Sequence, residues 1–104
     1  MKRVAVEEVE MYGDEKYACP VLFKGDRATT LLLCLKPGQA IPAHRHEGFE
    51  VALYPLKGEA ETVLDGEHVR LRAGEMIFVD GANDFAIANK GQENFSMLIT
   101  LARR

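Results

Sequence analysis

Apolar residues along the chain fall in short runs that are rich in Val, Leu, Ile, Phe and Thr and are separated by glycine-containing turns. Runs of this kind are typical of β-strands, and no long stretch shows the 3.6-residue apolar period of a helix. Many short strands with regular spacing predict an all-β sandwich or barrel. The predicted strands cover residues 4–9, 20–24, 28–36, 41–46, 49–56, 59–64, 67–72, 76–80, 83–88 and 94–102.

The clearest turn lies in the segment ETVLDGEHVRL, where Asp65-Gly66 separates two strand-like runs. This dipeptide favours the positive φ angles of a tight hairpin turn. Alternation along the second strand puts Val69 and Leu71 on one face and His68 on the opposite, charged face. We therefore expect a hairpin here, with His68 on the surface.

Several predicted strands are apolar on both faces, which is more than a single interior requires. The segments LLLCL, MIFV and SMLITL show this pattern most clearly. One face of such a strand lines the barrel, and the other meets a second sheet or a second subunit. The pattern predicts a homodimer.

Composition and charge narrow the class of protein. The chain has 104 residues, of which 47% are hydrophobic and 28% charged, as expected for one folded domain over 1–104. Its net charge of -3 argues against a nucleic-acid partner, which would require clustered cations. No apolar run is long enough to span a membrane, and the glutamates of MKRVAVEEVE do not suit a signal peptide. We expect a soluble cytoplasmic protein with no membrane partner.

The two cysteines, Cys19 and Cys34, have neither CxxC spacing nor a neighbouring histidine. Cys34 lies within TLLLCLK, where a small buried apolar group is the simplest role. Cys19 precedes Pro20 and is predicted to be a free thiol. A disulfide between the two is the less favoured alternative, because the chain shows no export signal.

The segment PAHRHEGFE concentrates residues that can bind a metal. His44 and His46 lie two apart in a predicted strand and therefore face the same side. Glu50 keeps the same parity beyond a turn at Glu47-Gly48, so the three side chains are expected to converge from one hairpin. Two imidazoles and a carboxylate suit a divalent transition metal such as Fe, Mn, Zn, Ni or Co. The alternative is a polar turn whose charges are solvated.

The same residues resemble the first signature of the cupin family. Gly38 precedes His44-x-His46, and Glu50 follows after three further residues. Gly58 closes this signature one position later than the usual six-residue gap after the glutamate. The resemblance covers about residues 28–100. It implies a double-stranded β-helix (jelly-roll) cupin barrel over about 28–102, preceded by a strand segment over 1–27.

The second cupin signature is matched less completely, from Gly74-Glu75 to Asn89. Asp80 and Ala82 stand where the family usually has proline and glycine, and Phe85 stands where it usually has its third histidine. The resemblance therefore implies three metal ligands, His44, His46 and Glu50, with no fourth. Asp84, the neighbour of Phe85, is a weak alternative ligand, since adjacent strand residues face opposite sides.

Strand parity predicts the remaining pocket residues. Ala52 and Tyr54 share the predicted direction of Glu50, and Ile87 shares that of Phe85. Tyr54 could bring a hydroxyl to a bound ligand, or it could be a core aromatic. Phe85 would form an apolar wall.

Two functions remain open at this point. The first is a metalloenzyme of the dioxygenase, isomerase or lyase kind, in which the metal polarises a substrate oxygen or binds dioxygen. The second is a non-catalytic module or sensor that binds a small organic molecule with a weakly held metal or none. Nucleophilic catalysis is least favoured, because Ser96 lies in an apolar strand and neither cysteine has a placed base.

Overall fold

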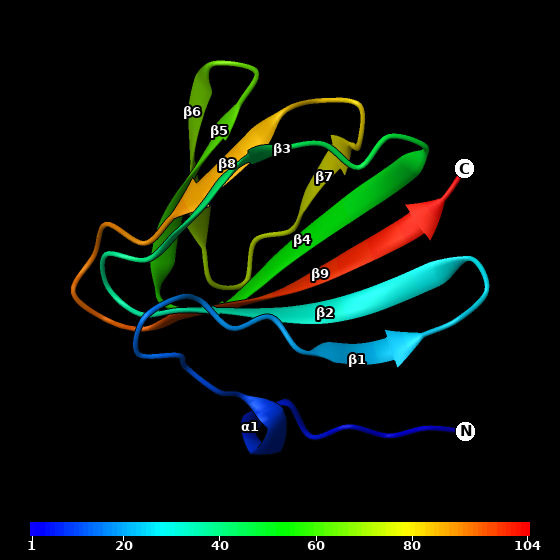
Figure 1. Ribbon diagram of the computed structural model, residues 1–104, viewed down its shortest axis with the longest axis horizontal. Helices are drawn as coiled ribbons and strands as arrows, with labels where there is room; N and C mark the ends of the chain where they lie inside the picture. The colour runs from blue at the N-terminus through cyan, green and yellow to red at the C-terminus, as the bar shows by residue number, and fades with distance from the viewer.

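Nine strands and one short helix make up the fold, which is described here from a computed structural model of residues 1–104 (Figure 1). No helix in the structure has the length and apolar character needed to cross a membrane. The elements are α1 (Val6–Val9), β1 (Val21–Lys24), β2 (Ala28–Leu35), β3 (Ala40–His44), β4 (Phe49–Lys57), β5 (Glu59–Leu64), β6 (Glu67–Arg72), β7 (Ile77–Asp80), β8 (Phe85–Ala88) and β9 (Phe95–Arg103).

The strands form two antiparallel sheets that face each other. Sheet A has the strand order β1-β2-β9-β4-β7, and sheet B has the order β3-β8-β5-β6. Strands distant in the sequence are neighbours in both sheets, as when β9 lies between β2 and β4. This is the jelly-roll arrangement of a double-stranded β-helix, and the predicted all-β barrel is confirmed.

The hairpin between β5 and β6 forms as the Asp65-Gly66 dipeptide predicts. Asp65 has φ 46° and Gly66 has φ 87°, and Leu64 pairs with Glu67 across the turn. Two positive φ angles are what the right-handed twist of a two-residue hairpin requires. On β6, Leu71 is buried and His68 is exposed, so the predicted facing of this strand is also confirmed.

The main hydrophobic core lies between the two sheets. On β4, Val51, Leu53 and Pro55 are buried, while the residues that alternate with them are more exposed. We call this group the barrel core; its buried members are Leu33, Leu35, Val51, Leu53, Ala60, Leu71, Val79, Phe85, Ile87, Phe95, Met97 and Ile99.

A second cluster lies on the opposite face of sheet A, beneath the N-terminal segment. The predicted strand over 4–9 is wrong, because α1 forms there as a single turn. Val6 and Val9 are three apart, so one helical turn directs both side chains to the same side, where they pack against Leu32 and Cys34. Figure 1 shows α1 on the side of β1 and β2 that faces away from sheet B. The N-terminal segment therefore covers part of the apolar face that predicted a homodimer.

Candidate functional site

A bulge near the end of β3 shapes the candidate site. Ile41 pairs with Ile87 on β8 and His44 pairs with Phe85, so three steps on β3 match two on β8. The extra residue lies in the segment Pro42-Ala43, where the proline has no N–H to donate to a neighbouring strand. The bulge makes Ile41 and His44, three positions apart, the more buried residues of β3.

Three rings form a compact group at this end of the barrel. The ring centroids of His44 and His46 lie 4.8 Å apart in an edge-to-face arrangement. The ring of Phe85 lies 4.6 Å from that of His44 and 5.8 Å from that of His46. Such separations are typical of interacting aromatic rings. The predicted pairing of the two histidines is therefore realised, although β3 ends at His44 and His46 belongs to the turn that follows.

The surroundings of the two imidazoles determine the tautomer of neutral His44 and lower the pKa of His46. His44 Nδ1 lies 3.0 Å from the Pro42 carbonyl oxygen, which can only accept a hydrogen bond. The proton of neutral His44 is therefore on Nδ1, and Nε2 is the nitrogen available to a ligand. Burial lowers the pKa of His46, and the neighbouring His44 lowers it further. His46 is consequently neutral at physiological pH.

The histidines line a cavity of about 360 Å³ whose other walls are mainly apolar. This volume lies in the range of sites for small organic molecules. The predicted pocket residues Phe85 and Ile87 belong to its lining. The complete lining consists of Tyr17, Cys19, Leu31, Ile41, Pro42, His44, His46, Phe85, Ile87 and Ile99.

Tyr17 and Cys19 are pocket residues that the sequence reasoning missed. Ala18 between them forms an isolated bridge with Cys34 on β2, so its two neighbours point the other way, into the cavity. Burial, with a smaller effect from Cys34, raises the pKa of the Cys19 thiol to about 11. Cys19 is therefore a protonated, neutral wall of the pocket at physiological pH. The alternation Tyr-Ala-Cys was the available signal.

Glu50 does not lie with the histidines, which corrects its predicted position. Its side chain is on the outer face of sheet A, where Glu50 pairs with Asp80 on β7 and Ala102 on β9. Val51, its neighbour, is 1% exposed and points into the barrel. Parity could not be counted through the turn, because the apolar residues of β4 fix which face is buried.

Ala52 and Tyr54 share the outer face of Glu50, so the prediction that they line the pocket is also wrong. Ala52 lines a separate outer depression of about 280 Å³ together with Glu50. Tyr54 pairs with Leu98, a residue that packs against the cluster beneath the N-terminal segment. Two signals in the sequence indicated this facing. Phe49, Val51 and Leu53 form the more apolar alternating set, and Gly58 comes one position late in the cupin signature.

Asp84, the weak alternative ligand, is engaged outside the cavity. Its Oδ1 accepts a hydrogen bond of 2.6 Å from Arg45 Nε, and Arg45 also lies 3.7 Å from Glu47. The Arg45 guanidinium holds the pKa of Asp84 below its usual value. The pleat argument that directed Asp84 away from Phe85 therefore agrees with the structure.

The donor set at the histidines does not fit the divalent metal that the cupin resemblance implies. No group of three His, Cys, Asp or Glu side chains anywhere in the chain is arranged to hold a metal ion. His44 and His46 supply two imidazoles, while Glu50 is on the outer face and Phe85 has no donor atom. Transition-metal sites of the catalytic kind need at least three protein ligands.

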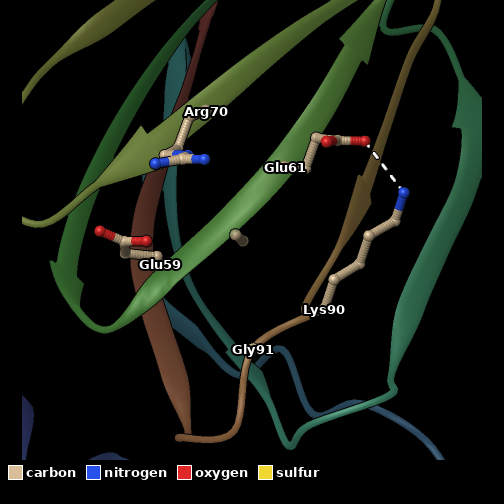
Figure 2. Close-up of a pocket in the computed structure, with 6 residues that line it drawn as sticks. Glu59, Glu61, Arg70, Lys90 and Gly91 are labelled. Carbon is tan, nitrogen blue, oxygen red and sulfur yellow. Dashed lines mark hydrogen bonds and ion pairs between the residues drawn. The ribbon is translucent and has the colours of Figure 1, made fainter.

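A second, charged pocket lies on the outer face of sheet B. Figure 2 shows Glu59, Glu61, Arg70 and Lys90 around it, with Lys90 reaching Glu61 at 3.1 Å. Glu61 also accepts a hydrogen bond of 2.9 Å from His68. These ion pairs lie on a solvated sheet face, where each contributes little to stability. His68 belongs to this face, as predicted.

Fold and cavity together define a double-stranded β-helix barrel with a mainly apolar cavity that two histidines line. Residues 31–101 match the sequence model of the cupin domain, and the chain belongs to the cupin family. The Oxalate-binding protein of Thermotoga maritima is 31% identical over 67 residues, covering 64% of this chain and 55% of that protein. The chain thus matches little more than half the length of this relative.

Two solved structures have nearly the same fold. The crystal structure of TT1209 from Thermus thermophilus has a TM-score of 0.93 and 28% identity, covering 100% of this chain and 99% of that one. A conserved protein with a double-stranded β-helix domain from Klebsiella pneumoniae has a TM-score of 0.91 and 21% identity, covering 98% of this chain and 84% of that one. The second similarity concerns the fold alone.

Proposed function

We propose that this chain binds a small organic molecule in the barrel cavity, with His44 and His46 as its polar contacts. The observation that carries the proposal is the cavity itself, which combines a volume of about 360 Å³ with mainly apolar walls and two adjacent imidazoles. Of the two functions left open by the sequence, this arrangement supports the small-molecule binding module. A divalent metal held by His44, His46 and Glu50 is not supported, because the three side chains lie on different faces.

The chemistry of the cavity describes the ligand. Apolar side chains favour a hydrophobic body, and the Phe85 ring favours a flat one. An imidazole nitrogen accepts a hydrogen bond when it is unprotonated and donates one when it carries a proton. A carboxylic acid can pair with either form, because a carboxyl group donates to the first and a carboxylate accepts from the second. We therefore propose an organic acid with an apolar, planar body.

The curated relative named as an oxalate-binding protein supports an acidic ligand but not the same one. Oxalate is a small dianion that needs several donors or cations around it. The guanidinium of Arg45, the residue between the two histidines, is paired with Asp84 and is not part of the cavity lining. A monocarboxylate with a larger apolar part fits this lining better than oxalate does.

Titration with benzoate and with oxalate tests the proposal, in buffer that contains a chelator. Saturable benzoate binding that shifts the ring NMR signals of both histidines is the expected result, with weaker oxalate binding. Replacement H46A is expected to abolish the benzoate response, while E50A on the outer face leaves it unchanged. If neither acid binds, or if benzoate binds H46A as well as the unaltered protein, the proposed site is incorrect.

A further inference from the structure

We infer that the barrel takes its ligand without a metal ion, because β4 is shifted by one residue relative to the cupin signature. This inference rests on the proposed small-molecule site and concerns how that site makes its contacts. The resemblance to the first cupin signature implies a carboxylate beside the two histidines. The structure puts an apolar side chain at each of the two positions that would complete such a site, and each is fixed by an independent observation.

The first position is Val51. Counting back from Gly58 by the usual six-residue gap reaches Val51, whereas Glu50 lies one residue earlier. In a strand, a shift of one residue exchanges the two faces. Val51 accordingly pairs with Val79 and Leu101 and belongs to the barrel core. The interior position of the signature glutamate is thus occupied by a valine.

Glu50 is held on the opposite face by its surroundings. It lies in the outer depression near Asp80, whose Oδ2 forms an ion pair with Arg104 Nη2 at 2.9 Å. Bringing Glu50 into the barrel would require every residue of β4 to exchange faces, which would expose Val51, Leu53 and Pro55. Since each of these is buried in the present register, the hydrophobic core prevents that exchange.

The second position is Phe85, the residue at the place of the usual third histidine. It is 1% exposed and contacts both imidazoles through its ring. Its ring occupies the space that a third imidazole would use, at centroid distances of 4.6 Å and 5.8 Å from the others. His44 and His46 are therefore free to contact an organic ligand directly.

Calorimetric titration with Zn²⁺ and with Mn²⁺ tests the inference, on tag-free protein from which metals have been removed with a chelator. The unaltered protein is expected to show no stoichiometric site. Variant F85H adds a third imidazole and is expected to bind Zn²⁺ at least about tenfold more tightly, because three histidines form a known zinc set. Adding V51E to F85H is expected to tighten Zn²⁺ binding again.

Matched variants separate the possible outcomes. Glu50→Gln is expected to leave the Zn²⁺ affinity of F85H unchanged, and F85H alone keeps the test decisive if V51E does not fold. Stoichiometric metal in the unaltered protein that is lost in H44A, E50Q or C19S would overturn the inference. So would an F85H protein that gains no affinity. Neither result concerns benzoate binding in chelator, which tests the proposed function separately.

Discussion

His44 and Phe85 face each other across the pair of strands β3 and β8, and their ring centroids lie 4.6 Å apart. The phenylalanine is both a member of the barrel core and a wall of the cavity. One residue thus couples the stability of the barrel to the shape of the site. The imidazoles pack against a buried core residue, which would preorganise the proposed binding site.

Phe85→Ala is expected to destabilise the protein by about 3–5 kcal/mol, the usual cost of emptying a buried phenylalanine site. It should also weaken benzoate binding, because both imidazoles lose the ring against which they pack. Denaturant unfolding measures the loss of stability, and the benzoate titration measures the loss of binding. Phe85→Leu retains most of the buried volume and should lose less stability. Equal stability of the Phe85→Ala and unaltered proteins would show that residue 85 is not buried in the core.

The sequence predicted most of this fold because local chemistry determined it. Asp65-Gly66 carries its own turn geometry, and the strands beside it alternate cleanly. The positions of His44 and Phe85 likewise follow from the resemblance to the cupin signatures. The face of β4 depended instead on which alternate residues the whole barrel buries, so counting from His46 through a turn misplaced Glu50.

The N-terminal contributions were missed for a different reason. Val6 and Val9 form a helical turn only because sheet A offers an apolar surface for it. The pocket residues Tyr17 and Cys19 depend on one bridge between Ala18 and Cys34, residues that are far apart in the sequence. A pattern within a few residues carries no information about such contacts.

Gly81→Ala is expected to disturb the turn that carries His46. Gly81 accepts a 2.8 Å hydrogen bond from His46 N and donates one of 2.9 Å to the Phe49 carbonyl. An added Cβ would collide with the His46 carbonyl oxygen and lie 2.5 Å from that of Phe49. We expect lower thermal stability and altered His46 ring signals in NMR spectra.

Gly25→Ala provides the control, because its Cβ would meet only the Ala28 carbonyl oxygen, at 3.4 Å, an ordinary contact distance. This variant should stay close to the unaltered protein in stability and should leave the His46 signals unchanged. A Gly81→Ala protein that behaves like Gly25→Ala would contradict the close approach of β4 and the His46 turn.

Cys19 and Cys34 are expected to remain unpaired under oxidising conditions. Both are free cysteines, and they lie on opposite faces of sheet A, since Cys19 packs against the barrel core and Cys34 against the outer cluster. A disulfide requires Cβ atoms that point toward each other. Mass spectrometry after mild oxidation should therefore find no intramolecular bridge. Finding one in folded protein would require the 17–19 segment to rearrange.

The homodimer stays a prediction, and Phe78 is the residue with which to test it. Its side chain is 77% exposed on β7, an edge strand of sheet A, and the cluster beneath the N-terminal segment does not include it. Light scattering should give twice the chain mass for the unaltered protein and a monomer for Phe78→Glu. A monomeric unaltered protein would contradict the prediction. A dimeric Phe78→Glu protein would show that the interface lies on another face.

The ion pair between Glu10 and Lys57 should stabilise the N-terminal segment in a pH-dependent way. Lys57 Nζ lies 2.8 Å from Glu10 Oε2, and the Glu10 side chain is 19% exposed. The hydrogen bond from Lys57 holds the pKa of Glu10 below its ordinary value of 4.5. A lowered folded-state pKa gives stability that is fully present above about pH 4.5 and is lost as the pH falls through the folded-state value.

Lys57→Met should therefore reduce the free energy of unfolding at neutral pH by less than about 1 kcal/mol, the range of partly exposed ion pairs. The difference from the unaltered protein should shrink as the pH falls from 6 to 3, because protonated Glu10 loses its charge in both proteins. Urea unfolding of both proteins across this pH range measures the difference in their free energies of unfolding. Lys24→Met is the control, since Lys24 belongs to none of the ion pairs in the structure, and the stability difference that it causes should not change with pH. A Lys57→Met difference that is constant with pH would show that the lysine acts by packing on the Tyr12 ring, 5.4 Å away, and not through Glu10.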